Sequence, residues 1–592
     1  MRVDDFAGVV RFFIDEAARF VSPLAVAIQW ELVFLAAVAI WLTPRQSAKF
    51  LQPWRRAFRR LASHRGASIA LCGLLPVAIR LSLLGVYPVP EPSIHDEFSH
   101  LLLADTLVHG RLSNPTHPLW QHFESIHIIQ QPTYNSMYPP GQGAFLALGV
   151  WLFREPWAGV VISVGLMFAA MCWMMQAWLP APWALFGTLL AILAFGVTSA
   201  WMNSYLGGAV AGTGGGLLLG AVRRLRDVAG TRRVRAQNAV LLGAGIVLLM
   251  STRPFEGLAL TAAALVYLAC GIYRNRGRNL AWFIPIAVPA GLIVGAGLIF
   301  NGFYNWRVTG SPWRMPYEVN RETYGWPENL GFLPIRKVTF QHPVLGAMYR
   351  KEIAHHNIYS EWNLFVDSLA LRAFENWSFF CGPALTLPFL LLPKLFLDRR
   401  TRPLLIILAV MLGLNLFQMV LYPYHLGPVV PALFTLLAQG SRHIYVLLSR
   451  AKPARGMVFA VLFPLCVAAA STLKLEASDL KLPVAYWERA AEAHRDNRAY
   501  LQAWLSSRPK KQLVIVHYSP THSPDQEWVY NAADIDKSKV VWAREMDPQS
   551  DARLIGYFQD REVWLLNADS DPPRVRPYFE DFGSCRTNPD AR

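Results

Sequence analysis

The sequence predicts an all-α, multi-pass membrane domain followed by a small soluble α/β domain. Hydrophobic residues make up 53% of the 592 residues, whereas charged residues make up only 16%. The apolar residues gather in runs long enough to cross a bilayer, giving about twelve crossings. The composition becomes polar after residue 473. These observations together describe a polytopic membrane protein rather than a series of soluble domains.

The charge pattern places one side of the membrane domain in the cytoplasm. The formal net charge is +16, and its basic residues cluster in short loops between apolar runs, for example at 45–65 and 223–235. Cytoplasmic loops of membrane proteins carry this excess of Lys and Arg. We therefore expect membrane lipids around the protein and no nucleic-acid partner. The six cysteines show no metal-binding or disulfide spacing.

The chain divides into three predicted parts. We expect an amphipathic helix at 1–20, a transmembrane domain at 21–473 and a soluble domain at 474–592. The predicted apolar runs are 21–42, 67–87, 144–153, 157–178, 182–201, 207–222, 237–252, 256–273, 280–303, 377–397, 403–421, 427–447 and 456–473. The run 144–153 is too short to span a bilayer. It must be interfacial or re-entrant for the basic loops to stay on one side.

Two long polar stretches then fall on the outer side. The first, 88–143, follows the outward-crossing run 67–87, and the second is 304–374. In a bacterial inner membrane this side is the periplasm, and the C-terminal domain is expected there too. That domain should contain strands and helices at 485–506, 513–518, 540–543, 551–558 and 563–566. It lacks a Gly-rich phosphate loop, so we expect it to pack on the membrane domain or contact an acceptor.

The stretch 88–143 carries the strongest candidate for chemistry. Asp96 and Glu97 are adjacent carboxylates next to a membrane surface. Such a pair is suited to general base catalysis or to binding a cation. Acids also favour the first turn of a helix, and Ser93 with Asp96 fits a capping box. Composition alone leaves both interpretations open.

Two runs within this stretch resemble a known family: PSIHDEFSH at 92–100 and YPPG at 138–141. They resemble the first periplasmic loop of class C (GT-C) glycosyltransferases, in the protein O-mannosyltransferase and aminoarabinose transferase branch with its RgtA/B/C/D-like relatives. The resemblance implies a GT-C-like membrane enzyme that takes a sugar from a polyprenyl-phosphate-linked donor. The acceptor would be a glycan, lipid or protein of the cell envelope. One departure is Tyr138, where the aminoarabinose branch places a Lys before the proline.

The resemblance makes Asp96 the candidate base and Glu97 a helper that orients it or binds a cation. An inverting transfer needs one base for the acceptor hydroxyl, and two neighbouring carboxylates repel, which raises one pKa. A divalent cation at Asp96 and Glu97 stays an alternative. Arg253 is the candidate for neutralising the departing phosphate. Its other interpretation is an interfacial arginine or a partner of Glu256.

Four further residues are candidates on the sugar-donor side: Asn203, Tyr205, Tyr138 and His425. Asn203 and Tyr205 could bond sugar hydroxyls, or serve only a loop turn. His425 could contact phosphate, or belong with its neighbouring tyrosines to an aromatic belt. A second polar group lacks the helical HExxH spacing, and we expect it to be polar surface rather than a metal site: His117, His122, Glu124 and His127.

The alternative function is a polytopic transporter or lipid flippase. A transporter should concentrate ionisable groups at mid-bilayer and show broken helices in both halves of the chain. In this sequence the paired carboxylates lie at the outer surface, and no internal repeat is visible. The sequence therefore favours a glycosyltransferase.

Overall fold

The computed structural model of the protein describes most of the chain. The described residues are 23–44, 46–92, 94–226, 231–274, 280–324, 340, 343–358, 362–418, 422–479, 495–520, 522, 527–570 and 572–579. The amphipathic helix predicted at 1–20 lies outside them.

The protein is a mostly helical, multi-pass membrane protein. Within the described residues, six helices are long and apolar enough to cross a membrane: α4 (Arg65–Ser82), α7 (Pro156–Trp178), α10 (Arg232–Met250), α11 (Pro254–Arg274), α12 (Leu280–Thr309) and α20 (Pro453–Asp479). The number rises to eight if each of two bent pairs is one span, α2 (Pro23–Leu42) with α3 (Ser47–Ser63), and α15 (Trp362–Phe380) with the helices of Gly382–Leu397.

The described residues therefore support six to eight candidate spans rather than the predicted twelve. Several predicted runs are broken or short in the structure. The run 377–397 bends by 100° after α15 and continues as α16 (Gly382–Thr386), η3 (Leu387–Leu391) and α17 (Leu392–Leu397). Three other apolar helices are shorter than a bilayer: α6 (Pro140–Phe153), α8 with its π turn (Ala181–Gly196) and α18 (Arg402–Asn415). An apolar run in the sequence thus does not guarantee a straight helix of spanning length.

Two more helices are long but less apolar than the candidate spans. They are α9 (Gly208–Arg226) and α19 (Val430–Ala451), and α9 is buried along nearly its whole length. Glycine allows other backbone to approach α9 closely. A Cβ on Gly215 would lie 1.9 Å from the carbonyl oxygen of Pro428, in η4 (Pro423–Val429). Gly215 therefore lets η4 pack directly against α9.

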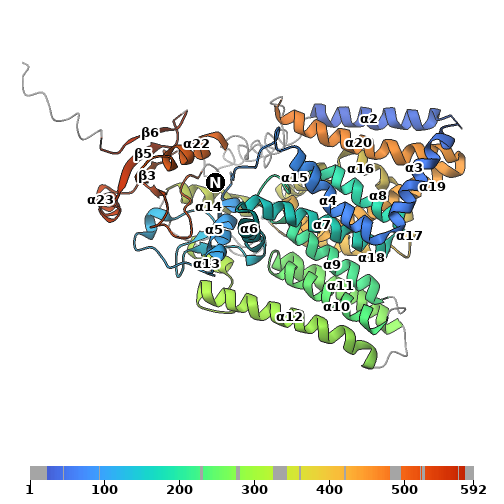
Figure 1. The fold of residues 1–592 in the computed structure, drawn as a ribbon, viewed down its shortest axis with the longest axis horizontal. Helices are drawn as coiled ribbons and strands as arrows, with labels where there is room; N and C mark the ends of the chain where they lie inside the picture. The colour runs from blue at the N-terminus through green and yellow to red at the C-terminus, as the bar shows by residue number, and fades with distance from the viewer. Residues whose placement is uncertain are drawn as a thin grey trace, which may run out of the picture.

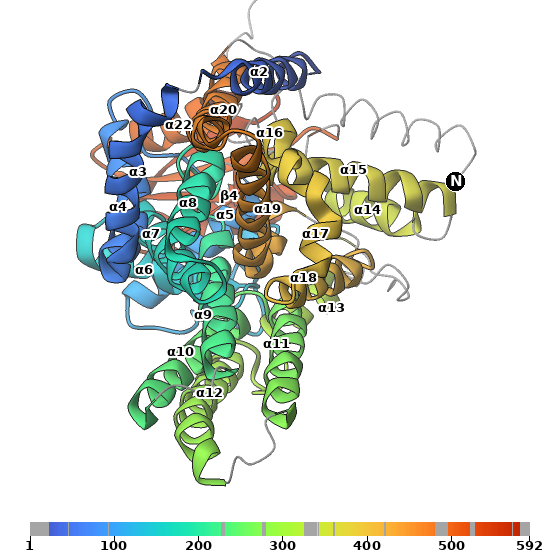
Figure 2. The same cartoon turned by 90° about the vertical axis from the view of Figure 1, so that its right-hand side faces the viewer.

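The helical bundle has two opposite sides and one crowded end. α2 and α20 lie on one side, whereas α10, α11 and α12 lie on the other (Figures 1 and 2). The first loop, α13 (Pro316–Tyr324), α14 (Pro343–Ile358) and the C-terminal domain gather at the same end of the bundle (Figure 1). Parts of both polar stretches, 88–143 and 304–374, thus lie at this end, and the two stretches were predicted to share one side of the membrane.

The first loop has a compact structure of its own. It contains α5 (His95–Val108), η1 (Trp120–Phe123), and a small antiparallel pair formed by β1 (Ile128–Ile129) and β2 (Asn135–Ser136). Its β pair lies against α5. The hydroxyl of Ser99, in α5, donates to the carbonyl oxygen of His127 at 2.7 Å and lies 2.8 Å from the hydroxyl of Ser136. The loop then enters α6 through two consecutive prolines.

The C-terminal domain is a small mixed sheet with helices, which agrees with the predicted α/β class. Strands β3 (Lys511–His517), β4 (Val540–Arg544) and β5 (Arg561–Asn567) are parallel, and β6 (Arg574–Pro577) is antiparallel at the edge, in the order β4-β3-β5-β6. The helices are α22 (Arg495–Ser506) and α23 (Pro548–Tyr557). Strand β6 was not predicted, because its RVRP sequence carries little apolar signal and ends in proline, as edge strands can.

Candidate active site

Asp96 lies at the centre of a cluster drawn from three separate parts of the chain. It sits in the first turn of α5 and is 9% exposed. Its Oδ1 atom accepts hydrogen bonds from Nδ1 of His127 and from the hydroxyl of Tyr138. Its Oδ2 atom lies 3.3 Å from the hydroxyl of Tyr424, in η4. Because an ionised carboxylate can only accept hydrogen bonds, the proton shared with His127 belongs to Nδ1.

The local backbone explains why His127 and Tyr138 reach Asp96. His127 has a left-handed backbone with φ of 62°, next to strand β1. Its carbonyl oxygen accepts from Ser99, and the amide of Tyr138 donates to the Ser136 hydroxyl at 3.1 Å. The hairpin is thereby fixed to α5 on both of its strands, and the two side chains meet the helix near its N-terminus.

The electrostatics of the cluster favour an ionised Asp96. Burial raises the pKa of its carboxyl, but the charges of His127 and His95 and the hydrogen bonds from His127 and Tyr138 lower it, and the result lies well below the ordinary value. Burial and the neighbouring carboxylate of Asp96 raise the pKa of Tyr138 far above that of a free tyrosine. Asp96 is therefore a carboxylate, and Tyr138 is a neutral hydrogen-bond donor.

Arg253 approaches the same cluster from the junction of α10 and α11. Its guanidinium carbon lies 4.7 Å from the ring centre of Tyr424, whose hydroxyl faces Asp96. Gly141 holds this junction in place. Its amide donates to the carbonyl oxygen of Ser251 at 2.7 Å, and a Cβ there would come within 2.6 Å of that same oxygen. Glycine at the start of α6 therefore allows the Arg253 junction to pack beside Tyr138.

Glu256, the predicted alternative partner of Arg253, forms a hydrogen bond with another residue. The carboxylate of Glu256 accepts from the side-chain amide of Gln418 at 3.3 Å. Within the part of the chain that the structure describes, Arg253 forms no ion pair. A guanidinium keeps its charge and presents a planar set of donors, so Arg253 could receive an anion.

Histidines complete the surroundings of Asp96. The ring of His100 stacks on Tyr138 at 4.5 Å, and the ring of His95 meets that of His127 edge-on at 4.5 Å. Burial and the positive charges of Arg253 and His127 lower the pKa of His100 to about 3, although Asp96 opposes this shift. His425 accepts from the amide of Tyr422 through Nδ1 at 2.9 Å, and burial and Arg253 hold its pKa well below the usual value.

Both carboxylate oxygens of Glu97 accept hydrogen bonds from backbone amides. One carboxylate oxygen accepts from the amide of Tyr205 at 2.9 Å, and the other accepts from the amide of Ile94 at 3.2 Å. The second bond is that of an acid at the N3 position of a helix reaching back to its N-cap. The helix-start interpretation of the acidic pair therefore describes Glu97, with Ile94 as the N-cap, whereas Asp96 belongs to the cluster.

Asn203 and Tyr205 also have structural partners. The side-chain oxygen of Asn203 accepts from Nε of Arg80 at 2.7 Å, and its amide group donates to the carbonyl oxygens of Val197 and Ser199. The hydroxyl of Tyr205 donates to the carbonyl oxygen of Pro90 at 2.9 Å. Both residues thus fasten the segment that leads into α5, and the cluster brings together Asp96, Tyr138, Arg253 and His425 but not these two.

One set of side chains could hold a metal ion. Single ligand atoms of His95, Asp96 and His127 all lie within 4.8 Å of one another. Imidazole and carboxylate ligands suit Zn²⁺ and related ions. Glu97, which the sequence paired with Asp96 for a cation, is not in this set.

The expectation that four polar residues form polar surface was wrong. His117, His122, Glu124 and His127 are all buried. His127 contacts Asp96, and the other three lie at the interface with the C-terminal domain or α13, where the hydroxyl of Tyr324 donates to Glu124 at 3.0 Å. Burial follows from the docking of distant segments, although the isoleucines on both sides of His127 were a local signal that this position is covered.

Comparisons with known proteins give overall similarity only. No family model matches the chain, and no curated protein matches it in sequence. Among solved structures, the chain is similar to ArnT from Cupriavidus metallidurans in the apo state, with a TM-score of 0.46 and 13% identity over 83% of this chain and 92% of that one. The same protein bound to undecaprenyl phosphate gives a TM-score of 0.45 at 13% identity, with the same coverage of both chains.

A second similarity is to the oligosaccharyltransferase of Archaeoglobus fulgidus in the apo form. The TM-score is 0.39 and the identity 12%, over 85% of this chain and 69% of that one. At this level of identity and TM-score no function follows from the similarity, and we base the functional assignment on the site itself.

Proposed function

We propose that the protein is a membrane glycosyltransferase that moves a sugar from a polyprenyl-phosphate-linked donor to a cell-envelope acceptor on the periplasmic side. The observation that carries this proposal is the Asp96 cluster, an ionised carboxylate with Arg253 close by. The class of substrate comes from the first-loop resemblance, because the cluster contains Asp96 of the first resembling run.

The reaction follows from the charges in the cluster. The acceptor hydroxyl attacks the anomeric carbon, a new C–O bond forms, and the bond between that carbon and the phosphate oxygen breaks. The hydroxyl proton passes to Asp96. Because the pKa of Asp96 is low, this transfer occurs late, when bond formation has made the hydroxyl acidic. A single displacement of this kind inverts the anomeric configuration.

Arg253 and the tyrosines complete the assignment. The leaving group is a polyprenyl phosphate anion, and Arg253 supplies fixed positive charge for it. Tyr138 and Tyr424 hold the two oxygens of Asp96, and His425 lies against the ring of Tyr424 with ring centres 4.6 Å apart. Glu97, Asn203 and Tyr205 act in this proposal as positioning residues that fix the start of α5.

A transfer assay with the purified protein tests the proposal. The protein in lipid nanodiscs is incubated with polyprenyl-phosphate sugars and envelope extract, and release of polyprenyl phosphate is followed by mass spectrometry. We expect acceptor-dependent release with the wild type. Absence of release with every sugar and extract, or release that needs no acceptor, would count against a transferase.

A further inference from the structure

One face of the C-terminal sheet forms part of the core around α5. In strand β3, Leu513 and Ile515 join a buried cluster with Phe98 and Leu102 of α5. The alternate residues of the same strand, Val514 and Val516, pack on the opposite face with Leu501 and Leu505 of α22. Because both faces of the sheet are covered, residues 513–516 of β3 form a continuous apolar run. The first loop is thus one of the two layers that bury this sheet.

Phe98 is the contact nearest to the proposed chemistry, two residues after Asp96. The ring of Tyr530 stacks on it with centres 4.0 Å apart and planes within 7°. The guanidinium of Arg498, from α22, lies 4.7 Å from the same ring. Arg498 is itself held, because it donates to the carbonyl oxygens of Trp528 at 3.2 Å and Tyr530 at 3.1 Å.

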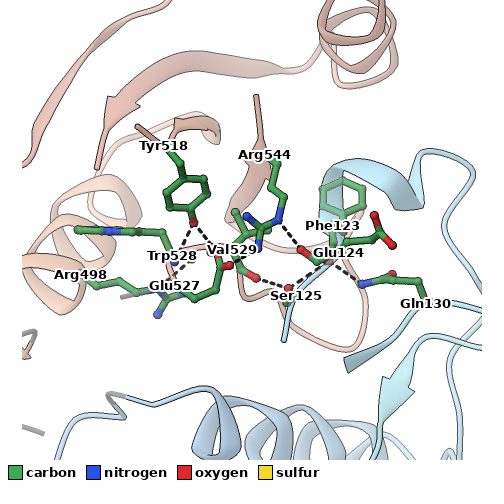
Figure 3. A network of polar contacts seen from close by, with 10 residues as sticks. All are labelled: Phe123, Glu124, Ser125, Gln130, Arg498, Tyr518, Glu527, Trp528, Val529 and Arg544. Carbon is green, nitrogen blue, oxygen red and sulfur yellow. Dashed lines mark hydrogen bonds and ion pairs between the residues drawn. The ribbon is translucent and has the colours of Figure 1, made fainter. Parts of the chain in front are cut away.

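The segment 527–536 that carries Tyr530 is fastened to the first loop at several points. Arg544 pairs with Glu527 and donates to the carbonyl oxygen of Glu124 at 2.6 Å, and Ser125 donates to Val529 (Figure 3). Arg544 and Glu527 are both buried, and removing either partner would leave an uncompensated buried charge. Figure 3 shows these side chains pointing towards one another across the boundary between the two parts.

The same segment contacts both elements that form the Asp96 cluster. The amide of Ala533 donates to the carboxylate of Asp105, near the end of α5, at 2.7 Å. The hydroxyl of Tyr134, in the turn of the hairpin that presents His127, donates to the carbonyl oxygen of Asn531 at 3.0 Å. The C-terminal domain therefore touches the helix of Asp96 and the hairpin of His127 at once.

We propose that the C-terminal domain is a positioning element of the active site, in which Tyr530 and Arg498 clamp Phe98 and thereby fix Asp96 relative to His127. This inference rests on the proposed function for its catalytic consequence, but the clamp itself is a structural property. Displacing a reacting group by roughly 1 Å can cost about 100-fold in rate. Neither Tyr530 nor Arg498 has to touch a substrate for this effect.

Three variants separate positioning from general destabilisation. Tyr530→Ala removes the stacked ring. Tyr530→Phe keeps the ring and removes a buried hydroxyl that has no hydrogen-bond partner among the described residues. Val514→Ala is the matched control, because Val514 is fully buried in the same domain but faces α22 rather than α5. Full-length protein in nanodiscs is used throughout, at a temperature where thermal unfolding shows all variants folded.

Two readouts are measured on each variant. Hydrogen exchange of the amides of α5 reports the clamp without any substrate. We expect faster exchange in Tyr530→Ala and wild-type exchange in Tyr530→Phe and Val514→Ala. In the transfer assay we expect kcat to fall about tenfold or more in Tyr530→Ala only, with KM for the sugar donor unchanged.

The outcomes distinguish this inference from the proposed function. Unchanged exchange of α5 in Tyr530→Ala, or equal acceleration in Val514→Ala, overturns the clamp whatever the enzyme does. Faster exchange with no loss of kcat overturns its catalytic consequence. If the wild type transfers no sugar while α5 exchange responds as expected, the clamp stands and the proposed function fails.

Discussion

The hydroxyl of Tyr424 lies 3.3 Å from Oδ2 of Asp96, although 328 residues separate the two in the chain. The same tyrosine presents its ring to the guanidinium of Arg253 at 4.7 Å. One side chain therefore links the carboxylate proposed to receive the proton with the cation proposed to receive the phosphate. This arrangement makes the two roles separable by experiment.

Replacing Tyr424 by Phe should remove the first link and keep the second. The ring that faces Arg253 is retained, whereas Asp96 loses one hydrogen bond. A hydrogen bond to a charged group contributes about 1.5–3 kcal/mol, so kcat should fall about tenfold or more. KM for the sugar donor should stay at the wild-type value. Steady-state kinetics that show a raised KM with normal kcat would reverse the assignment.

Arg253 should govern the handling of the phosphate. Arg253→Gln removes the charge, and we expect kcat/KM to fall by roughly 100-fold, the cost of losing one donor to developing negative charge. Arg253→Lys keeps a point charge without the planar fork, so its loss should be smaller. Equal activities of the Gln and Lys variants would show that charge at this position is not used.

His127 should set the pH range of activity. Its charge and hydrogen bond help to hold the pKa of Asp96 below the ordinary value, although burial acts in the opposite direction. In His127→Asn the burial of Asp96 remains and its favourable interaction with the imidazole is lost, so the pKa of Asp96 rises. The acid limb of kcat/KM should move to higher pH. A pH profile with an unmoved acid limb would show that His127 does not tune Asp96.

The same pKa has a consequence for stability. The folded-state pKa of Asp96 lies below its unfolded value of about 3.9. Its contribution to the free energy of unfolding is therefore fully present above that unfolded pKa, and is lost as pH falls towards the folded value. In His127→Asn the folded-state pKa of Asp96 moves up towards the unfolded value, so the stability lost on acidification below that unfolded value, measured by thermal unfolding, should be smaller than in the wild type.

Asn203 should matter for stability rather than for binding the sugar donor. Arg80 is 2% exposed and uses Asn203 together with the carbonyl oxygens of Tyr87 and Pro88. Asn203→Ala removes one partner of a buried charge, which should cost about 2 kcal/mol. KM for the sugar donor, measured on folded protein, should not change. A rise in KM at unchanged melting temperature would support the original sugar-donor-binding expectation.

The sequence could predict the elements that depend on local pattern. The strands β3, β4 and β5 were recognisable as short buried apolar runs, and the polar first loop between two apolar runs pointed to Asp96. The sequence predicted acids in the first turn of a helix, but it placed the capping box at Ser93 and Asp96, whereas Glu97 reaches back to Ile94 in the structure. Asp96 and Glu97 occupy positions N2 and N3 of the same helix turn, so residue type alone does not show which of the two caps the helix.

The rest of the site depends on contacts between distant segments. His127 is 31 residues from Asp96, and only the left-handed turn and the hairpin fixed by Ser99 bring them together. Tyr424 reaches the cluster because Gly215 lets η4 pack against α9. No pattern of hydrophobicity or charge along the chain encodes these approaches. Within the described residues six to eight helices are candidate spans, fewer than the predicted twelve, and the predicted run 377–397 is bent by 100° after α15.

The transfer rate of Asp96→Asn tests the central claim most directly. This variant keeps the size of the side chain and removes the charge. Glu97→Gln, which makes the same change at the adjacent residue, is the comparison variant. With purified, folded proteins and a polyprenyl-phosphate sugar that the wild type uses, we expect no measurable transfer from Asp96→Asn and a partial loss from Glu97→Gln. Wild-type turnover by Asp96→Asn would contradict the account.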